Sequence, residues 1–142
     1  MELKNKKILI TGGKGFLGSH IVENLISRGV SKENIFAVSS NDLDLRDFNN
    51  CKKAVEGKDM VIHLAAKVGG IGFNQKYPGT LFYDNLIMGV QLMEVARTAG
   101  VEKFVGVATI CSYPKFTPVP FKEEEIWNGY PEETNAPYGL AK

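Results

Sequence analysis

The chain has 142 residues, 44% of them hydrophobic, with 17 lysines and arginines against 16 aspartates and glutamates. This length suits one domain with a buried core, and the balanced charge argues against a nucleic-acid-binding protein, whose domains are usually strongly basic. No apolar run approaches the roughly 18 residues of a membrane helix, the N-terminus lacks the apolar core of a secretory signal, and two cysteines make no disulfide framework. We therefore expect a cytoplasmic protein that binds neither nucleic acid nor membrane.

Short apolar runs alternate with longer amphipathic segments, which predicts β-α-β units and a parallel sheet. Strands are expected at residues 7–11, 34–38, 59–64 and 103–108, and helices at 15–28, 47–55 and 78–99. One apolar stripe of the first helix should face the sheet and comprises Phe16, Leu17, Ile21, Val22, Leu25 and Ile26. Residues 111–137 hold five of the six prolines and are predicted to be mostly loop, before a further helix begins near Tyr138.

A glycine-rich turn, TGGKGFLG at residues 11–18, lies between the first expected strand and the first helix. Gly12 permits a tight turn, Gly15 allows backbone N–H groups to approach a pyrophosphate, and Gly18 allows close packing of the helix on the sheet. The helix N-terminus adds partial positive charge and unpaired N–H donors. The turn therefore predicts a Rossmann-like dinucleotide site; the alternative is a turn that serves packing alone. Its members are Gly12, Gly13, Lys14, Gly15, Phe16, Leu17 and Gly18.

The residues after the second strand favour NADP(H) over NAD(H). An NAD site usually has an acid there for the ribose hydroxyl, but the sequence offers Ser39, Ser40 and Asn41 before the first acid, Asp42. These polar groups can donate hydrogen bonds to a 2′-phosphate, and Lys14 can add a cation, although it could equally be a solvated loop lysine. Further cofactor contacts are expected from Asp44 and Leu45 near the adenine and from Leu64, Ala65, Ala66, Lys67, Val107 and Ala108 near the ends of the third and fourth strands.

Tyr138 and Lys142 are four residues apart, so they share one face of the last expected helix. An ammonium beside a phenol favours the phenolate and lowers the pKa of the tyrosine, which could then exchange a proton with a carbonyl or alcohol oxygen. Lys142 could also hold the nicotinamide ribose. Thr109, at the end of the fourth strand, offers a hydroxyl to the same substrate oxygen.

The segments TGGKGFLG, HLAA and YGLAK resemble the extended short-chain dehydrogenase/reductase family of sugar-nucleotide epimerases and dehydratases. Residues 66–71 (AKVGGI), 111–115 (CSYPK) and 133–138 (ETNAPY) are similar to segments of GDP-L-fucose synthases. The resemblance covers the whole chain. It implies a Rossmann-like doubly wound parallel sheet over residues 1–142, an incomplete NAD(P)-binding domain whose C-terminal substrate domain is absent from this chain.

The same resemblance implies the activity. The full-length enzyme is expected to carry out 3,5-epimerisation and NADPH-dependent 4-keto reduction of GDP-4-keto-6-deoxymannose, and to be a homodimer, whereas these residues alone are expected to be inactive. Tyr138 is implied as the proton donor with Lys142 as its partner, and Thr109 stands at the Ser/Thr position. Cys111 is implied as the base at the carbon next to the ketone, a role that suits a thiolate. Nothing is assigned to a metal.

Three departures and two alternatives remain. Ser40 and Lys14 stand where the family has arginines, which weakens the NADP prediction, and the family's histidine acid would lie beyond residue 142. Residues 69–75 (GGIGFNQ) also resemble GDP-mannose 3,5-epimerases, the nearest alternative among related epimerases and dehydratases. A non-catalytic dinucleotide-binding module is the alternative from another class.

Overall fold

The computed structural model describes residues 2–142, which divide into two compact units. Unit 1 takes the chain up to Ala66 together with Ile87–Val107, and unit 2 takes Lys67–Leu86 together with Ala108–Lys142. No helix within residues 2–142 has both the length and the apolar character needed to cross a membrane.

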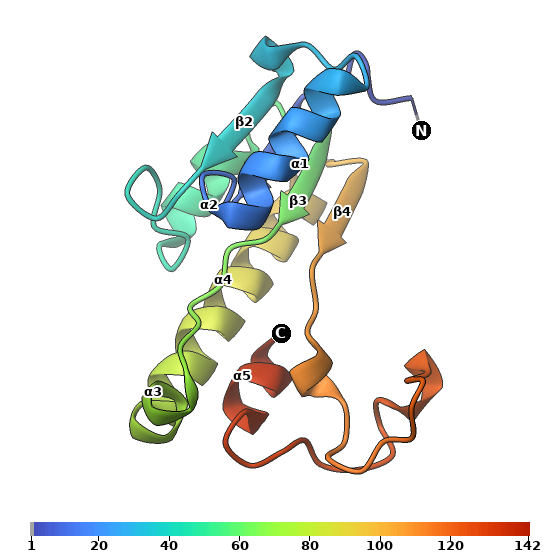
Figure 1. Cartoon of the computed structure of the whole chain (residues 1–142). Helices are drawn as coiled ribbons and strands as arrows, with labels where there is room; N and C mark the ends of the chain where they lie inside the picture. Colours follow the sequence, from blue (N-terminus) through green and yellow to red (C-terminus); the bar gives the residue numbers. More distant parts are fainter. Residues whose placement is uncertain (1) are drawn as a thin grey trace. The chain divides into compact units, whose positions relative to one another are not determined.

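Unit 1 contains a parallel sheet of four short strands in the order β2-β1-β3-β4 (Figure 1). The strands are β1 (Ile8–Thr11), β2 (Ile35–Val38), β3 (Met60–His63) and β4 (Lys103–Gly106). Ile8 of β1 is in register with Ile35 on one side and with Met60 on the other. Since β2 and β3 flank β1, the chain changes direction across the sheet at β1, where open α/β sheets bind ligands beyond the carboxyl ends of their strands.

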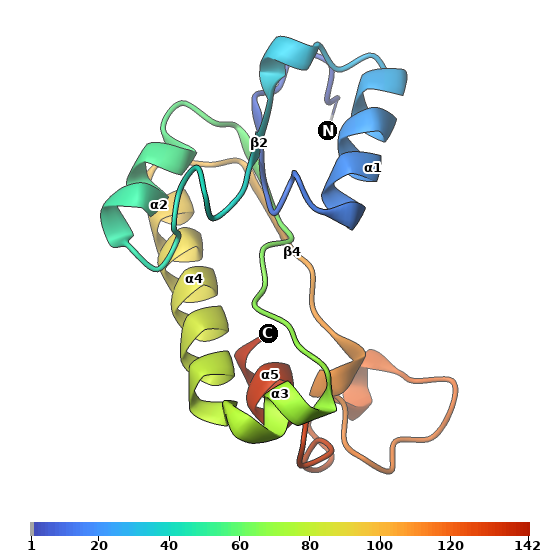
Figure 2. The ribbon, with the colours of Figure 1, turned by 60° about the vertical axis from the view of Figure 1, so that its left-hand side comes forward.

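Helices cover both faces of this sheet, as the doubly wound prediction requires (Figure 2). On one face, α1 (Phe16–Ser27) packs Leu25 against Ile8 and Ile10. On the other face lie α2 (Phe48–Val55) and the part of α4 (Pro78–Thr98) that belongs to unit 1. The core on that face is formed by Leu9, Leu45, Cys51, Ala54, Val55, Val61, Leu92, Val95 and Ala96. The predicted α/β class is confirmed.

The predicted apolar stripe of α1 is only half right. Leu25 is buried and Ile21 and Val22 pack against the core, but Phe16, Leu17 and Ile26 are 85%, 49% and 41% exposed. Successive helical residues are about 100° apart, so Phe16 points almost opposite to Gly18, which packs against the glycine-rich turn. The exposed pair at the start of α1 therefore lies beside the glycine-rich turn and adds nothing to the core.

Unit 2 is mostly loop, as predicted, with short helical elements. It includes α3 (Ile71–Lys76), the first part of α4, the 3-10 turns η2 (Ile110–Ser112) and η3 (Glu123–Glu125), and α5 (Ala136–Ala141). The helix at residues 71–76 is not predicted from the sequence, because six residues that include a glycine show no helical periodicity of apolar side chains. The fourth strand is also two residues shorter than predicted, since pairing with β3 ends at Gly106.

Candidate functional site

The glycines of the turn are required by close contacts in unit 1. Gly12 has a φ of +69°, and a Cβ there would lie 3.0 Å from the backbone nitrogen of Ala65. A Cβ on Gly13 would lie 2.7 Å from the Cβ of Ala37, and one on Gly18 would overlap the carbonyl oxygen of Gly12. The turn thus packs against the ends of β2 and β3 with no room for side chains.

The N-terminus of α1 fits an anionic group. Gly15 is its N-cap, no side chain caps it, and its first turn holds no acidic residue. The first N–H groups of a helix have no partner within the helix, and the helix dipole favours negative charge there. These features match the pyrophosphate of a dinucleotide, so the residues of the turn would hold that group.

The Asp42 carboxylate is bonded to two of the residues that are predicted to bind a 2′-phosphate. Its carboxylate lies 2.6 Å from the Lys14 ammonium and accepts hydrogen bonds from the Ser39 backbone N–H (2.7 Å) and hydroxyl (2.6 Å). The hydrogen bond from Lys14, followed by those from Ser39, holds the pKa of Asp42 well below its usual range. Ser40 and Asn41 are exposed. Two of the four predicted phosphate ligands are therefore engaged by an acid.

The residues predicted near the adenine have other partners. Leu45 is only 4% exposed, and its side chain packs in the core with Leu9 and Cys51. The expected place of this residue near the adenine stays a prediction. Asp44 pairs with Arg46 at 2.7 Å on the surface. The sequence signal for the burial of Leu45 is its apolar side chain one turn before the second helix.

The carboxyl ends of β1 and β3 are joined by a buried polar contact. The Thr11 hydroxyl lies 2.7 Å from Nδ1 of His63 and accepts a hydrogen bond of 3.3 Å from the backbone N–H of Ala65. His63 is 6% exposed, so this contact is a buried link between the two strands. Leu64, Ala65 and Ala66 are half-buried, whereas Val107 is 40% exposed and Ala108 is exposed.

Lys67 belongs to unit 2 and is fixed by two neighbouring residues of α4. Its ammonium lies 2.7 Å from the buried carboxylate of Asp84. The Asn85 side chain accepts a hydrogen bond from the Lys67 backbone N–H (2.8 Å) and donates one to its carbonyl (2.9 Å). The segment that follows the predicted HLAA motif is thus held by both backbone and side-chain contacts.

Three of the four predicted catalytic residues are brought together in unit 2. Thr109 caps η2 by accepting a hydrogen bond of 3.2 Å from the Cys111 N–H, and its side chain also hydrogen-bonds Tyr138. The pKa of Tyr138 is raised, first by burial and then by the nearby Cys111, while the Thr109 hydrogen bond lowers it less. This direction is opposite to the predicted one. Burial outweighs the hydrogen bond, and Lys142 is not among the charges that act on the phenol.

Lys142 itself lies at the C-terminal end of α5, which ends at Ala141. Burial lowers the pKa of its ammonium. Its predicted role beside Tyr138 therefore stays a prediction, because sharing a helix face does not bring a flexible lysine onto a neighbouring phenol.

A close contact between η2 and α5 explains why Cys111 and Tyr138 meet. The Ser112 hydroxyl donates a hydrogen bond of 2.6 Å to the carbonyl of Gly139. A Cβ on Gly139 would overlap the Cys111 carbonyl group, so the absent side chain lets the two elements touch. Beyond the glycine itself, no sequence signal indicates this contact.

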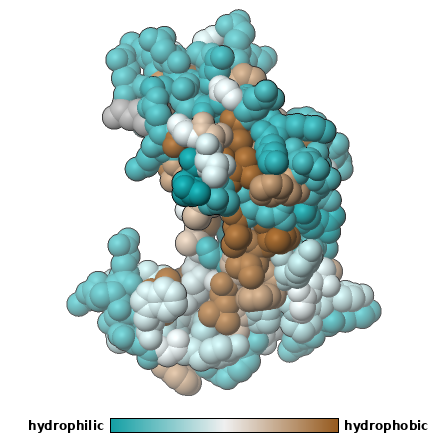
Figure 3. Space-filling model, turned by 180° about the vertical axis from the view of Figure 1, so that it is seen from behind, coloured by the Kyte–Doolittle hydropathy of each residue, from teal (hydrophilic) through white to brown (hydrophobic). Residues whose placement is uncertain are grey.

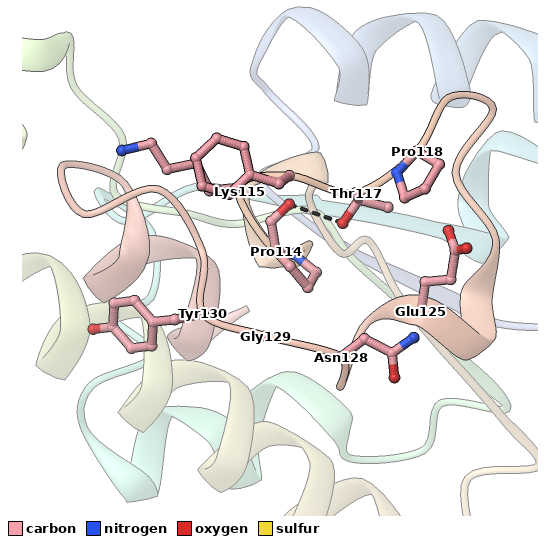
Figure 4. Close-up of a pocket in the computed structure, with 9 residues that line it drawn as sticks. Pro114, Lys115, Thr117, Pro118, Glu125, Asn128, Gly129 and Tyr130 are labelled. Atoms are coloured by element: carbon pink, nitrogen blue, oxygen red, sulfur yellow. Dashed lines mark hydrogen bonds between the residues drawn. The ribbon is translucent and has the colours of Figure 1, made fainter.

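Unit 2 also has a pocket of about 200 Å³ that contains none of the predicted catalytic residues (Figure 4). Thr117 donates a hydrogen bond to the Pro114 carbonyl at its edge (2.8 Å), and one oxygen of Glu125 is buried there without a hydrogen-bond partner. Its lining is Pro114, Lys115, Phe116, Thr117, Pro118, Glu125, Asn128, Gly129 and Tyr130. It contains neither the cluster of Thr109, Cys111 and Tyr138 nor any part of the glycine-rich turn, so it is not the candidate active site.

Residues 8–142 match the NAD dependent epimerase/dehydratase family. Among curated relatives, GDP-mannose 3,5-epimerase 1 of Oryza sativa subsp. japonica is 36% identical over 96% of this chain. GDP-L-fucose synthase of Sinorhizobium fredii is 36% identical over 99% of it. The chain spans 39% and 44% of the lengths of these two relatives.

Solved structures give the same picture. A GDP-mannoheptose C4 reductase from Campylobacter jejuni with NADP bound superposes with a TM-score of 0.90 at 28% identity, and the match covers 100% of this chain and 45% of the reductase. A GDP-L-fucose synthetase from Naegleria fowleri bound to NADP gives a TM-score of 0.84 at 30% identity and covers 100% of this chain and 46% of that one.

Proposed function

This chain belongs to the NAD-dependent epimerase/dehydratase family, and we propose that it is the cofactor-binding and catalytic N-terminal part of a GDP-sugar epimerase/reductase of the GDP-L-fucose synthase type. The reaction would be 3,5-epimerisation and NADPH-dependent 4-keto reduction of GDP-4-keto-6-deoxymannose. Because the chain spans less than half the length of its relatives, the activity is proposed for a polypeptide that also carries the C-terminal substrate domain.

The observation that carries this proposal is the cluster of Thr109, Cys111 and Tyr138. The raised pKa of Tyr138 keeps its phenol protonated at neutral pH, so Tyr138 can give a proton to a ketone oxygen as the carbonyl carbon is reduced. Thr109, which hydrogen-bonds Tyr138, would orient the same oxygen. Cys111, as a thiolate, would remove the proton on a carbon next to the ketone. Epimerisation is complete when an acid on the opposite face protonates that carbon, the role expected of the histidine beyond residue 142.

The cofactor supplies the hydride and its electron pair when bound. The residues that would hold it are those of the glycine-rich turn and the N-terminus of α1, and we propose NADP(H) rather than NAD(H). Support comes from the two solved relatives with NADP bound and from Lys14 and Ser39, provided that the 2′-phosphate displaces Asp42 from both.

The proposed partner is a second copy of the full-length protein. Apolar side chains are exposed on the face that Figure 3 shows. Among the exposed apolar residues of α4, Phe82 and Tyr83 belong to unit 2 and are 40% and 60% exposed, whereas Val90 and Met93 belong to unit 1 and are 55% and 56% exposed. An exposed apolar helix surface of this kind is typical of an interface between proteins.

The second candidate is a GDP-mannose 3,5-epimerase, favoured by the relative from rice. It would use the same Cys111 and Tyr138 with no net consumption of reduced cofactor. A non-catalytic dinucleotide-binding module is less well supported, because a binding module has no need for Thr109, Cys111 and Tyr138 in one cluster.

The test is NADPH oxidation by the full-length polypeptide with GDP-4-keto-6-deoxymannose, followed by absorbance. Turnover that is lost in Tyr138→Phe, with NADP binding retained, is the expected result. Isomerisation of GDP-mannose without NADPH oxidation would support the second candidate, and cofactor binding with neither reaction would support the binding module.

A further inference from the structure

A chain of side-chain hydrogen bonds leads from the turn before α5 to α3 inside unit 2. One carboxylate oxygen of Glu132 accepts a hydrogen bond of 2.8 Å from the side-chain amide nitrogen of Asn135. The amide oxygen of Asn135 in turn accepts one of 2.9 Å from the amide nitrogen of Asn74, which is only 6% exposed. A carboxylate and two amides are thus linked in series, although the two asparagines are 61 residues apart in the sequence.

The carboxylate fixes the direction of both amides. An ionised Glu132 can only accept, so the nitrogen of Asn135 must face it and the oxygen of Asn135 must face Asn74. The nitrogen of Asn74 is then committed to Asn135, and its own oxygen is left buried without a hydrogen-bond partner. A buried unsatisfied acceptor costs stability, so this orientation persists because the rest of the chain of hydrogen bonds imposes it.

Glu132 and Asn135 also build the start of the helix that carries Tyr138. The second carboxylate oxygen of Glu132 accepts a hydrogen bond of 3.0 Å from the Thr134 N–H. The backbone carbonyl of Glu132 accepts one of 2.8 Å from Ala136, and the carbonyl of Asn135 accepts one of 2.8 Å from Gly139. The hydrogen bond from the Thr134 backbone is the largest cause that lowers the pKa of Glu132, and the Asn135 backbone adds to it against the opposing effect of desolvation.

We propose that Glu132, Asn135 and Asn74 are positioning residues that set the place of Tyr138. Asn74 holds the first turn of α5 from the side of α3, while the Ser112 contact holds α5 at Gly139 from the side of η2. Tyr138 lies between these two attachments, where it meets Thr109. None of the three touches the reacting atoms in this role, and the catalytic part of the proposal rests on the proposed function of Tyr138.

Reversing the direction of the hydrogen bonds tests the idea. Asn74→Asp places a hydrogen-bond acceptor opposite the acceptor oxygen of Asn135. It should lower kcat of the full-length enzyme by roughly 10- to 100-fold, because a displaced proton donor slows the chemical step. KM for NADPH should change by less than about 2-fold. In the double variant, Glu132→Gln supplies a hydrogen-bond donor to Asn135. The side-chain amide of Asn135 can then rotate by 180° and donate to the carboxylate introduced at position 74. The backbone N–H of Asn135 keeps its bond to the Glu132 carbonyl in that variant (3.0 Å).

The double variant should therefore recover most of the kcat lost by Asn74→Asp. Asn128→Asp is the matched control, since Asn128 is exposed and lies in the loop of the pocket; it should leave kcat unchanged. A double variant as slow as the product of the two single effects would overturn the proposal, because independent damage to the fold is additive.

A second measurement does not depend on activity. In the 142-residue chain, amide hydrogen exchange of Gly139, followed by NMR, should be at least about tenfold faster in Asn74→Asp and return toward the wild-type rate in the double variant. If exchange at Gly139 and the titration of the Tyr138 phenol are both unchanged in Asn74→Asp, the positioning role is refuted even where the enzyme is active. If the wild-type enzyme has no turnover while exchange behaves as expected, the proposed function fails and the positioning contact stands.

Discussion

Replacing Asp42 by Asn should free Lys14 and Ser39 from the Asp42 carboxylate and strengthen the binding of a 2′-phosphate. In the wild-type chain the Asp42 carboxylate binds Lys14 at 2.6 Å and the Ser39 hydroxyl at 2.6 Å. An NADP phosphate must displace Asp42 from both groups, which removes the hydrogen bonds that lower the pKa of this carboxyl, and must then lie beside a negatively charged carboxylate. An amide at position 42 removes the negative charge and leaves Lys14 and Ser39 available.

The size of the effect follows from how exposed these groups are. The Lys14 and Asp42 side chains are 55% and 36% exposed, so the ammonium gains only what a solvated ion pair provides. Each of the two freed contacts should strengthen NADP binding by roughly threefold, which makes the expected gain in the NADP-to-NAD affinity ratio about tenfold. The gain should shrink at high salt, since exposed charges are screened.

Calorimetric titration of the 142-residue chain with NADP and with NAD measures this ratio directly. Glu102→Gln is the matched control, because Glu102 is also an exposed acid that pairs with a lysine, Lys6, outside the site; it should leave the ratio unchanged. Adding Lys14→Met to Asp42→Asn should remove most of the gain. Weaker NAD binding with unchanged NADP binding would refute the reasoning, since Asp42 would then be the ribose ligand of an NAD site.

Three further outcomes are expected. Gly18→Ala should lower the free energy of unfolding by about 1–3 kcal/mol in denaturant titrations, because its Cβ would overlap the Gly12 carbonyl, whereas Gly79→Ala, with nothing within 4 Å of the new Cβ, should not destabilise. Burial raises the pKa of Cys51 to about 11, so the folded state favours the neutral thiol. Below the unfolded pKa near 9 the thiol is neutral in both states, and the folded protein keeps its full stability. As the pH rises through 11, the free energy of unfolding should fall by about 2–3 kcal/mol. A Cys51→Ala variant should show a shallower alkaline loss, and an equal slope would contradict this. Iodoacetamide should alkylate the half-buried Cys111 well before the buried Cys51 in mass spectra of the native chain.

The sheet and its main helices could be predicted because their sequence signals are local. Apolar runs of four or five residues predict the buried strands, and the glycines that end α1 and α4, Gly29 and Gly100, have φ values of +87° and +76°. The faces of α1 were less predictable, since six apolar residues in twelve leave more than one possible stripe. In the structure, Ile21, Val22 and Leu25 pack in the core, while Gly18 packs against the turn.

The site was predictable by residue type but not by partner. The sequence predicts Lys14 and Ser39 as phosphate ligands and shows Asp42 as the first acid after β2, yet it does not show that the turn folds Asp42 back onto both. The sign of the Tyr138 pKa was wrong for a similar reason. A spacing of four predicts a shared helix face, whereas the pKa depends on how deeply the phenol is buried and on which charges lie near it.

The raised pKa of Tyr138 has a consequence for the direction of the proposed chemistry. A phenol with a lowered pKa suits oxidation of an alcohol, because it can take the proton that the alcohol loses; a phenol with a raised pKa keeps its proton and suits reduction of a ketone. Burial is the first cause of that rise and Cys111 the second. The cluster therefore favours a protonated Tyr138, which is the acid that reduction of a ketone requires.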